Sequence, residues 1–388
     1  MVFLHLEFLP SFQASMRLGL HITRGEVLPA IDLQPFLTTE IITKDGQVVS
    51  TWSDGKMLPE NYVFSTEMRP GEHVPVSKNI PVIDLGKAVG LDRKETIQKI
   101  IEASQEFGFF QVINHGVPQT VIDDARTAYQ DSFDLPTEEK LKLCSSDISQ
   151  KCIYYTSNVM YDDEDIHAWR HSLRHLRSPL EECIHSWPQK PTKYREVVGK
   201  YVTEVKEMGT RILELISEGL GLGVGYFANE LSQEQHMSIH RYPPCPDPSL
   251  TLGLKPHCDT GLITILLQGT VAGLQTLKDG QWIGFEAIPD AFVINIGYQL
   301  QMVSNGKLHS VEHRAVTNKD ETRMTAAFFI EPKKDCIVDY VEPAKALINA
   351  ESVKYAEFVQ MFRAAYSGKI KNALEPYMIT STSSLLTE

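Results

Sequence analysis

Three residues in the second half of the chain have the side chains and the spacing of a metal site. His257 and Asp259 are separated by one residue, so on an extended backbone both side chains leave the same face. His313 follows after enough chain for several strands and a return to a neighbouring one. Two imidazoles and one carboxylate on one face leave about three positions open on an octahedral ion. The pattern predicts a 2-His-1-carboxylate site of the non-haem iron(II) type.

A second pair of residues predicts an anion clamp. Arg323 and Thr325 also lie two positions apart, and an apolar run typical of a buried strand, AAFFIEP, follows them. On a strand both side chains would share one face. A guanidinium binds a carboxylate through two parallel donors, and a neighbouring hydroxyl adds a third. A metal triad beside such a clamp implies a chelating co-substrate that carries a second carboxylate.

Several longer segments around these residues form a recognisable set: YPPCPDPSLTLGLKPHCDTGLITILLQ, GLQTLKDGQWI, IPDAFVINIG, SNGKLHSVEHR and RMTAAFFIEP. PVIDL and FGFFQVINHGVP complete the set near the N-terminus. Together they resemble the plant 2-oxoglutarate- and Fe(II)-dependent dioxygenase family over about residues 58–378. Within it, SWPQKPTKYREVV and GYFANELSQ are most similar to the specialised-metabolism branch, the hyoscyamine 6-hydroxylase-like enzymes.

The resemblance implies a chemistry for the metal site. His257, Asp259 and His313 would bind Fe(II), with no catalytic residue expected beyond these ligands. The co-substrate 2-oxoglutarate would chelate the iron, O2 would react there, and ascorbate would serve as reductant. The products would be succinate, CO2 and an oxidised small specialised metabolite, with an alkaloid as one candidate. Hydroxylation is the expected reaction, and desaturation, epoxidation and demethylation are alternatives that the same site could catalyse.

The resemblance also assigns the co-substrate clamp to four residues. Arg323, Thr325 and Tyr242 would hold the distal carboxylate of 2-oxoglutarate, with His240 beside them. Thr325 replaces the family's usual Ser and keeps the hydroxyl, whereas His240 stands where Asn is common. Because an imidazole has an unperturbed pKa near ~6.5, we expect His240 to make 2-oxoglutarate affinity depend on pH between about 5.5 and 8.

Five aromatic or hydroxyl residues are expected to line the substrate pocket. KCIYYTSNV resembles the family's substrate-facing strand, which nominates Tyr154, Tyr155 and Thr156. Phe329 follows the clamp and is expected to face the pocket and stack on substrate. Tyr298 follows the NIG segment at a position where Asp is frequent in the family. The alternative is that these residues only pack within strands and the core, without contacting substrate.

Hydrophobic periodicity and turn residues predict a mainly β fold with helices. From Met237 onward, short strands alternate with Gly-, Asp- and Asn-rich turns, which is typical of a double-stranded β-helix, or jelly-roll, core. Helices are expected over residues 92–107, 117–135, 191–222 and, with interruptions, 343–371, and they would back the core. His115 is expected to fill a structural role in a turn.

These elements suggest four regions. Residues 1–57 form an N-terminal extension, and residues 58–225 form the N-terminal helical and strand region of the dioxygenase fold. Residues 226–340 form the Fe(II)/2-oxoglutarate jelly-roll core. Residues 341–388 form a C-terminal helical tail.

Composition limits the partners and the compartment. Formal net charge is −13, from 50 acidic against 37 basic residues, which argues against nucleic acid and gives no reason to expect a membrane surface. Six scattered cysteines lack any C-x-x-C pair and fit free thiols in a reducing compartment. No apolar run approaches a membrane span, and the N-terminus lacks the basic region of a signal peptide. We therefore expect a cytoplasmic monomer that acts on a small molecule.

Three other readings compete. An oxidase of the same fold that uses ascorbate instead of 2-oxoglutarate would keep the same ligands. A non-catalytic small-molecule binder would usually have lost a metal ligand, and all three are present. A zinc hydrolase is disfavoured because the chain has no H-E-x-x-H helix and no evident general base.

Overall fold

A computed structural model describes residues 41–42, 48–49, 57–71, 74–145, 147–159, 161, 164–339, 352–366 and 373. The chain separates into a unit Met1–Leu37, which lies outside the described residues, and a unit Thr38–Glu388. Most of the expected extension 1–57 and much of the tail 341–388 also lie outside the described residues. The account below therefore concerns the second unit.

Two facing β-sheets form the core of the fold. The major sheet has eight strands in the order β4-β5-β13-β10-β15-β8-β7-β6. Its pairs are antiparallel except β4 with β5. In chain order the strands are β4 Val82–Asp84, β5 Phe109–Ile113, β6 Cys152–Thr156, β7 His171–Leu176, β8 Glu234–Tyr242, β10 Ile263–Leu267, β13 Phe292–Ile296 and β15 Arg323–Glu331.

The minor sheet has five strands in the order β3-β12-β11-β14-β9. They are β3 Val76–Ser77, β9 Leu254–His257, β11 Leu274–Lys278, β12 Gln281–Phe285 and β14 His313–Ala315. From β8 to β15 the chain alternates between the two sheets, except that β11 and β12 form a hairpin within the minor sheet, as expected for the jelly-roll core. Two short pairs stand outside them, β1 Ile41–Ile42 with β2 Val48–Val49 and β16 Ile337–Asp339 with β17 Ser352–Lys354.

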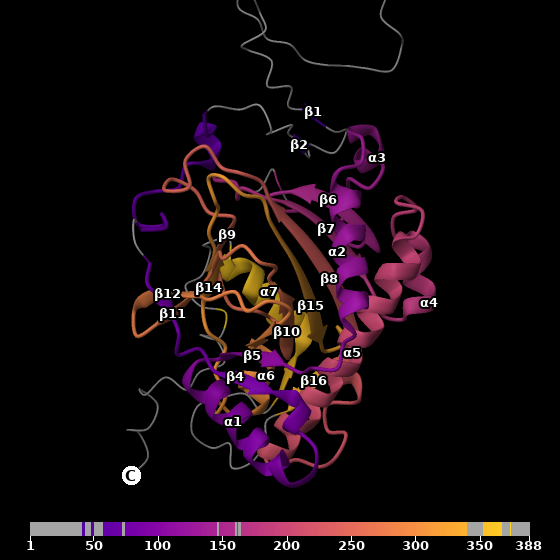
Figure 1. Cartoon of the computed structure of the whole chain (residues 1–388), viewed down its shortest axis with the longest axis vertical. Coiled ribbons are helices and arrows are strands. Elements are labelled where there is room, and N and C mark those ends of the chain that lie inside the picture. Colours follow the sequence, from indigo (N-terminus) through magenta and orange to yellow (C-terminus); the bar gives the residue numbers. More distant parts are fainter. Residues whose placement is uncertain are drawn as a thin grey trace, which may run out of the picture. The chain divides into compact units, whose positions relative to one another are not determined.

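Three helices, α1, α2 and α5, cover the major sheet on the side away from the minor sheet. The seven α-helices are α1 Arg93–Glu106, α2 Gln119–Phe133, α3 Thr137–Leu141, α4 Leu180–Cys183, α5 Tyr194–Gly219, α6 Tyr298–Val303 and α7 Tyr355–Tyr366, counted within the described residues. Figure 1 shows α2 and α5 running beside β6, β7, β8 and β15, with β9, β11, β12 and β14 on the other side. The predicted layout, helices backing a jelly roll, is confirmed.

Most predicted helices agree with the structure to within a few residues. The segments 92–107, 117–135 and 191–222 contain α1, α2 and α5. Gly108 ends α1 at φ +66, and a Cβ there would lie 2.5 Å from the carbonyl oxygen of His309, so the position requires glycine. The tail differs, because Val353 belongs to β17 and is buried against β16 before α7 begins.

The largest apolar cluster lies between the outer face of the major sheet and α1, α2 and α5. Ile239, Ile265 and Phe328 project from the sheet into it, and Met208 and Ile212 of α5 meet them. None of the helices described is long and apolar enough to cross a membrane. The helices therefore bury one face of the major sheet and leave its other face to the minor sheet.

Candidate metal centre and carboxylate clamp

The predicted metal ligands converge between the two sheets. His257 ends β9 and His313 begins β14, and the two residues face each other directly in the antiparallel pair. Asp259 follows β9 by two residues. One ligand atom from each of the three side chains lies within 4.8 Å of the others, and no other such group of His, Cys, Asp and Glu occurs in the described part of the chain. The two residues that their spacing placed on one face, His257 and Asp259, thus belong to one site with His313.

Hydrogen bonds fix which nitrogen each imidazole presents. The Nδ1 atom of His257 bonds the Lys255 carbonyl oxygen at 2.9 Å, and the Nδ1 atom of His313 bonds the Val311 carbonyl oxygen at 3.2 Å. Since a carbonyl only accepts, both Nδ1 atoms carry the proton, and each Nε2 keeps a free lone pair. These Nε2 atoms lie 3.6 and 3.7 Å from one Asp259 oxygen, Oδ1. The set thus presents two nitrogen ligands and one carboxylate to a single point.

The surroundings favour a ligand-ready charge state. Burial and the nearby His313 lower the pKa of His257 to about 3, so its imidazole is neutral. Burial alone would raise the pKa of Asp259, but the two imidazoles and hydrogen bonds from Thr264 and Asn295 outweigh it and lower that pKa. The Asn295 amide donates to Asp259 Oδ2 at 3.1 Å, leaving Oδ1 facing the imidazoles. This donor set fits a divalent transition metal.

The clamp residues lie opposite the metal ligands, on the major sheet. Arg323 and Thr325 of β15 are 2% and 3% exposed and pair with Tyr242 and His240 of β8. The Arg323 guanidinium lies 5.1 Å from the centre of the Tyr242 ring, and its Nε donates to the Val271 carbonyl oxygen at 3.1 Å. These four residues line one cavity of about 50 Å³ with the three metal-site residues. Minor and major sheet thus contribute one half of the site each.

A glycine opposite Arg323 makes room for its side chain. A Cβ at Gly273 would lie 2.8 Å from Arg323 Cδ and 3.0 Å from Nε. The Arg323 side chain therefore lies directly against the backbone of Gly273. A side chain at this position would collide with Arg323, whose guanidinium lines the cavity.

His240 lies in the clamp, and its surroundings lower the pKa of its imidazole. Its Nδ1 is 2.8 Å from the Ser172 hydroxyl, and it lines the cavity beside Thr325. Burial, then the positive charges of Arg170 and Arg323, lower the pKa of His240 well below 6.5. Burial therefore favours the neutral imidazole, and the pH dependence of 2-oxoglutarate affinity stays a prediction.

The three substrate-pocket candidates on β6 point to opposite faces of the major sheet. Tyr155 pairs with Ser172 and lies on the inner face, toward the site. Tyr154 packs against Phe133 of α2, and Thr156 bonds His171, both on the outer face. Because side chains alternate along a strand, only Tyr155 fits the pocket, and we withdraw Tyr154 and Thr156.

The other two substrate-pocket candidates differ in their surroundings. Phe329 lines the cavity and stacks on His236 with ring centres 4.4 Å apart. Tyr298 instead packs against Phe358 and Phe362 of α7, while its backbone N–H donates to the Asp259 carbonyl oxygen. Tyr298 therefore links the metal loop to α7 rather than forming the cavity wall.

Comparisons with known proteins agree with this geometry. The 2OG-Fe(II) oxygenase superfamily model matches residues 233–332, and the model of the non-haem dioxygenase in morphine synthesis N-terminal region matches residues 80–190. Protein DOWNY MILDEW RESISTANCE 6 of Arabidopsis thaliana is 44% identical over 329 residues, 81% of this chain and 94% of the relative. Hyoscyamine 6-dioxygenase of Hyoscyamus niger is 39% identical over 348 residues, 85% of this chain and 98% of the relative.

The chain belongs to the 2OG-Fe(II) oxygenase superfamily. A solved structure of JOX2 in complex with 2OG, Fe and JA superposes with a TM-score of 0.70 at 31% identity, covering 80% of this chain and 91% of that one. The predicted family, the jelly-roll core and the dioxygenase class are thus confirmed. The chain is a dioxygenase of the 2OG- and iron-dependent type that acts on small molecules, with plant relatives named for specialised metabolites.

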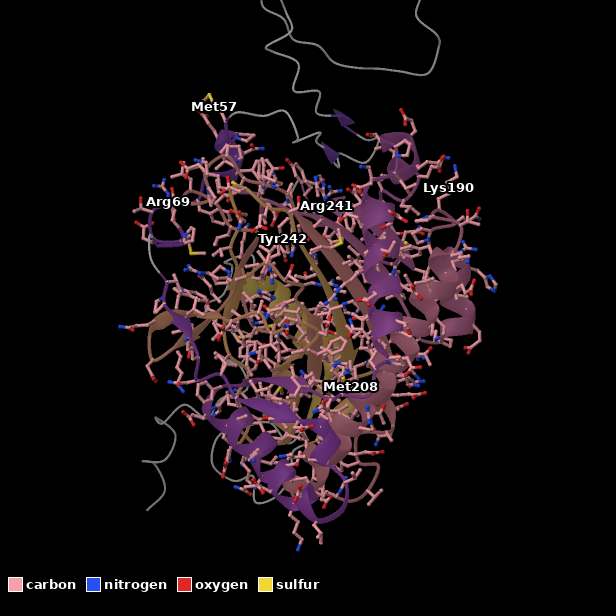
Figure 2. All side chains as sticks on the ribbon, in the orientation of Figure 1. Met57, Arg69, Lys190, Met208, Arg241 and Tyr242 are labelled. Carbon is pink, nitrogen blue, oxygen red and sulfur yellow. The ribbon has the colours of Figure 1, made fainter. Side chains whose placement is uncertain are left out.

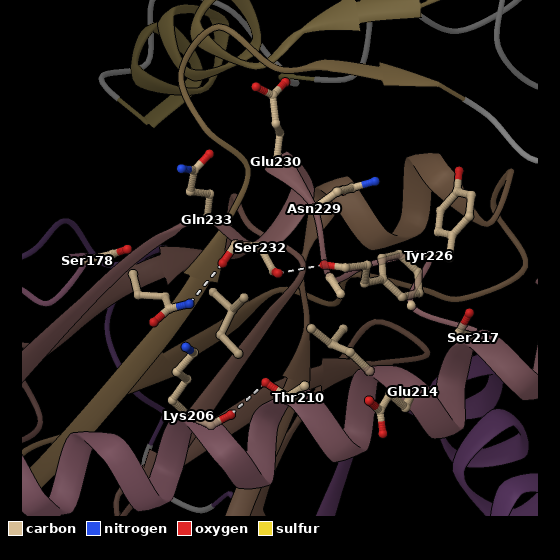
Figure 3. Close-up of a pocket in the computed structure, with 16 residues that line it drawn as sticks. Ser178, Lys206, Thr210, Glu214, Ser217, Tyr226, Asn229, Glu230, Ser232 and Gln233 are labelled. Atoms are coloured by element: carbon tan, nitrogen blue, oxygen red, sulfur yellow. Dashed lines mark hydrogen bonds between the residues drawn. The ribbon is translucent and has the colours of Figure 1, made fainter. Parts of the chain in front are cut away.

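A larger cavity of this oxygenase lies away from the metal centre. It measures about 590 Å³ and lies between α5 and the short 3-10 helix Glu230–Ser232 (Figure 3). Several polar groups around it are already bonded: Thr210 to the Lys206 carbonyl, Ser232 to that of Phe227, and Gln235 to that of Ser232. Among the described residues, no group of His, Cys, Asp and Glu that could hold a metal converges there.

Sequence reasoning missed the groups that support the metal ligands. Asn295 is the polar residue in the otherwise apolar strand FVINI, and that contrast was a usable signal. Thr264 interrupts the apolar strand ITILL in the same way. Arg170, discussed below, lacked such a signal, because only the pairing of β7 with β8 shows which way it faces.

Proposed function

We propose that His257, Asp259 and His313 hold one Fe(II) through two Nε2 atoms and one carboxylate oxygen. The convergence of these three ligand atoms within 4.8 Å is the observation that carries the assignment. When bound, iron supplies the activation of O2 that no amino-acid side chain provides. The chain fixes the tautomers through the Lys255 and Val311 carbonyls and orients the carboxylate through Asn295.

We propose that Arg323, Thr325 and Tyr242 bind the distal carboxylate of 2-oxoglutarate. The fully buried guanidinium would be costly without an anion, and it faces the metal ligands across one cavity. A bidentate Arg–carboxylate pair with two hydroxyl donors would satisfy both charges. His240, neutral and bonded to Ser172, would donate or accept beside them. This clamp favours 2-oxoglutarate over a same-fold oxidase that uses ascorbate alone.

We propose hydroxylation of a small specialised metabolite, with 2-oxoglutarate and O2 converted to succinate and CO2. Tyr155 and Phe329 would contact the substrate from the inner face of the major sheet. Desaturation, epoxidation or demethylation would use the same residues. Ascorbate would act as reductant, and an alkaloid is one candidate substrate because a relative is named hyoscyamine 6-dioxygenase.

We also propose that the protein works as a cytoplasmic monomer. All six cysteines are free, a state that a reducing compartment maintains. Light scattering of the purified chain should give the mass of one copy, and a stable dimer mass would contradict this part of the proposal.

The reaction is tested with the full chain, Fe(II), 2-oxoglutarate and O2 against a set of small molecules. Mass spectrometry should find a product that has gained one oxygen or lost two hydrogens, together with succinate. Omitting 2-oxoglutarate should abolish that product. Turnover that persists with ascorbate alone would instead support the ascorbate-dependent oxidase.

A further inference from the structure

Arg170 lies on the inner face of the major sheet, next to the clamp. Ser172, two residues later on β7, bonds His240 at 2.8 Å on that face, whereas Leu173 enters the apolar cluster on the other face. Because β7 pairs His171 with Arg241, the adjacent residue Arg170 comes beside Tyr242. Arg170 is 7% exposed, so its charge is buried.

The guanidinium of Arg170 is fixed by a hydrogen bond from its Nε atom, which leaves its two terminal nitrogens available. Its Nε donates to the Ser157 carbonyl oxygen at 2.9 Å. No described residue accepts a hydrogen bond from either terminal nitrogen. Ser157 is itself fixed, since its hydroxyl accepts from the Ala168 N–H at 2.7 Å and donates to Glu164. The two terminal N–H₂ groups are thus positioned donors without an acceptor among the residues that the structure describes.

The neighbouring carboxylate does not neutralise this charge. Glu164 lies near Arg170, but its Oε1 pairs with Lys255 at 3.2 Å and its Oε2 accepts from Ser157. One carboxylate therefore faces two cations, Lys255 and Arg170, and takes its hydrogen bonds from the first. Burial alone would lower the pKa of Arg170, but neighbouring tyrosines and Glu164 outweigh it, so the guanidinium stays charged. An anionic ligand at its terminal nitrogens would gain charge-assisted hydrogen bonds.

Arg170 and Arg323 flank Tyr242 on the same face of the sheet. Arg323 pairs with Tyr242 on one side, and Arg170 adjoins Tyr242 on the other. Two strand spacings separate the backbones of the two arginines by about 10 Å. Their Nε atoms are held by different carbonyl oxygens, those of Ser157 and Val271. Tyr366 of α7 lies near Arg170, and its ring centre is 6.4 Å from that of His257. Arg170 is therefore linked to the metal site through Tyr366, on the side of Tyr242 away from Arg323.

We propose that Arg170 binds an anionic group, a carboxylate, of the substrate that is oxidised. The carbon skeleton would lie against Tyr366 and reach from Arg170 to the metal site. This inference rests on the proposed function and narrows the substrate class to small organic acids. A protonated amine, such as an alkaloid, would meet a buried cation here and is therefore disfavoured.

The test compares acids with their neutral amides. Isothermal titration under anaerobic conditions would measure benzoate, benzamide, phenylacetate and phenylacetamide against the full chain loaded with Fe(II) and 2-oxoglutarate. At least one acid should bind the wild type about 10- to 100-fold more tightly than its amide, as for a hydrogen-bonded charge pair. Arg170→Gln should remove this preference, and Arg170→Lys should restore part of it.

A matched control removes the same charge from the same strand. Arg174 of β7 is tied to the Ile148 carbonyl by a 2.6 Å hydrogen bond, so Arg174→Gln should leave the acid preference unchanged. Fe(II) and 2-oxoglutarate affinities should be unaltered in the Arg170 variants. Thermal melting of each variant separates a folding defect from a binding defect.

Several outcomes overturn the proposal. Equal affinity of acids and amides in the wild type, or no saturable binding by either acid, would show that no anion site exists. Loss of 2-oxoglutarate affinity in Arg170→Gln would place Arg170 in the co-substrate clamp instead. A loss of thermal stability with the acid preference retained would make Arg170 a structural residue. Failure of the wild type to bind Fe(II) or 2-oxoglutarate would contradict the proposed function, and the acid–amide comparison on the unloaded chain would still test Arg170.

Discussion

Both faces of the major sheet are buried, but they differ in chemistry around the clamp. On β15, Arg323 is 2% exposed and points inward, while Phe328 is 1% exposed and points toward the helices. On β8, Tyr242 points inward, while Arg241 points outward and pairs with Asp134 at the end of α2 (Figure 2). Burial stabilises the apolar face and penalises the charged one. The outer face therefore supplies stability, and the inner face retains buried charge for ligands.

The largest effect should follow changes at the metal centre on the minor-sheet side. His257→Ala, Asp259→Ala and His313→Ala should each abolish turnover, because all three ligands are needed to hold the ion. Asn295→Ala, which removes only the hydrogen bond to Asp259, should lower activity about 10- to 100-fold. Succinate formation measures both. Substantial activity in any iron-loaded ligand variant would remove that residue from the site.

A comparable change on the outer face should affect folding instead. Phe328→Ala leaves a cavity in the cluster under α5 and should reduce the free energy of unfolding by about 3–5 kcal/mol. Urea denaturation measures the loss. Below the unfolding transition, the KM for 2-oxoglutarate should stay near the wild-type value. A changed KM with unchanged stability would mean that the two faces are not separable.

Arg323→Lys should act on the inner face with a smaller, specific effect. Lysine keeps the charge but loses the two-pronged geometry, so the KM for 2-oxoglutarate should rise about 10- to 100-fold. The midpoint of thermal unfolding should change little by comparison with Phe328→Ala. If initial rates against 2-oxoglutarate give the same KM, another cation holds the distal carboxylate.

The smallest effect concerns buried histidines of the outer face. Burial lowers the pKa of His175 to about 3, while its ring stacks on Trp187 and bonds the Tyr194 hydroxyl. Below about pH 6.5 the His175 imidazole is protonated in the unfolded chain but stays neutral in the folded chain. The free energy of unfolding therefore falls as the pH drops from 6.5 toward 3. At pH 5.5 this amounts to about 1.4 kcal/mol for one such group.

His175→Gln removes this proton linkage at the position. The unfolding free energy of that variant, measured by urea denaturation at several pH values, should decline less steeply between pH 7 and 5.5 than that of the wild type. His171, whose pKa burial also lowers to about 3, should retain its own contribution. Parallel pH profiles would show that His175 becomes protonated in the folded chain.

The sequence pattern predicted the helices on the outer face and the three metal ligands better than it predicted the other site residues of the inner face. Apolar periodicity places α1, α2 and α5, and a two-residue spacing suffices to pair His257 with Asp259. Cross-strand register is different, because it depends on which strands become neighbours. A shift of one residue separates Tyr155 from Tyr154, and the β7–β8 pairing alone brings Arg170 to Tyr242. Likewise, the lowered pKa of His240 follows from burial and from arginines that lie far from it in sequence.

The most direct test of the account is the stoichiometry of Fe(II) and 2-oxoglutarate binding. Anaerobic titration of the full chain should find one Fe(II) per chain and one 2-oxoglutarate whose affinity depends on the iron. Asp259→Ala should lose both, while Arg323→Lys should keep the iron and bind 2-oxoglutarate weakly. Iron retained by Asp259→Ala, or 2-oxoglutarate bound equally well without iron, would contradict a single site built from both sheets.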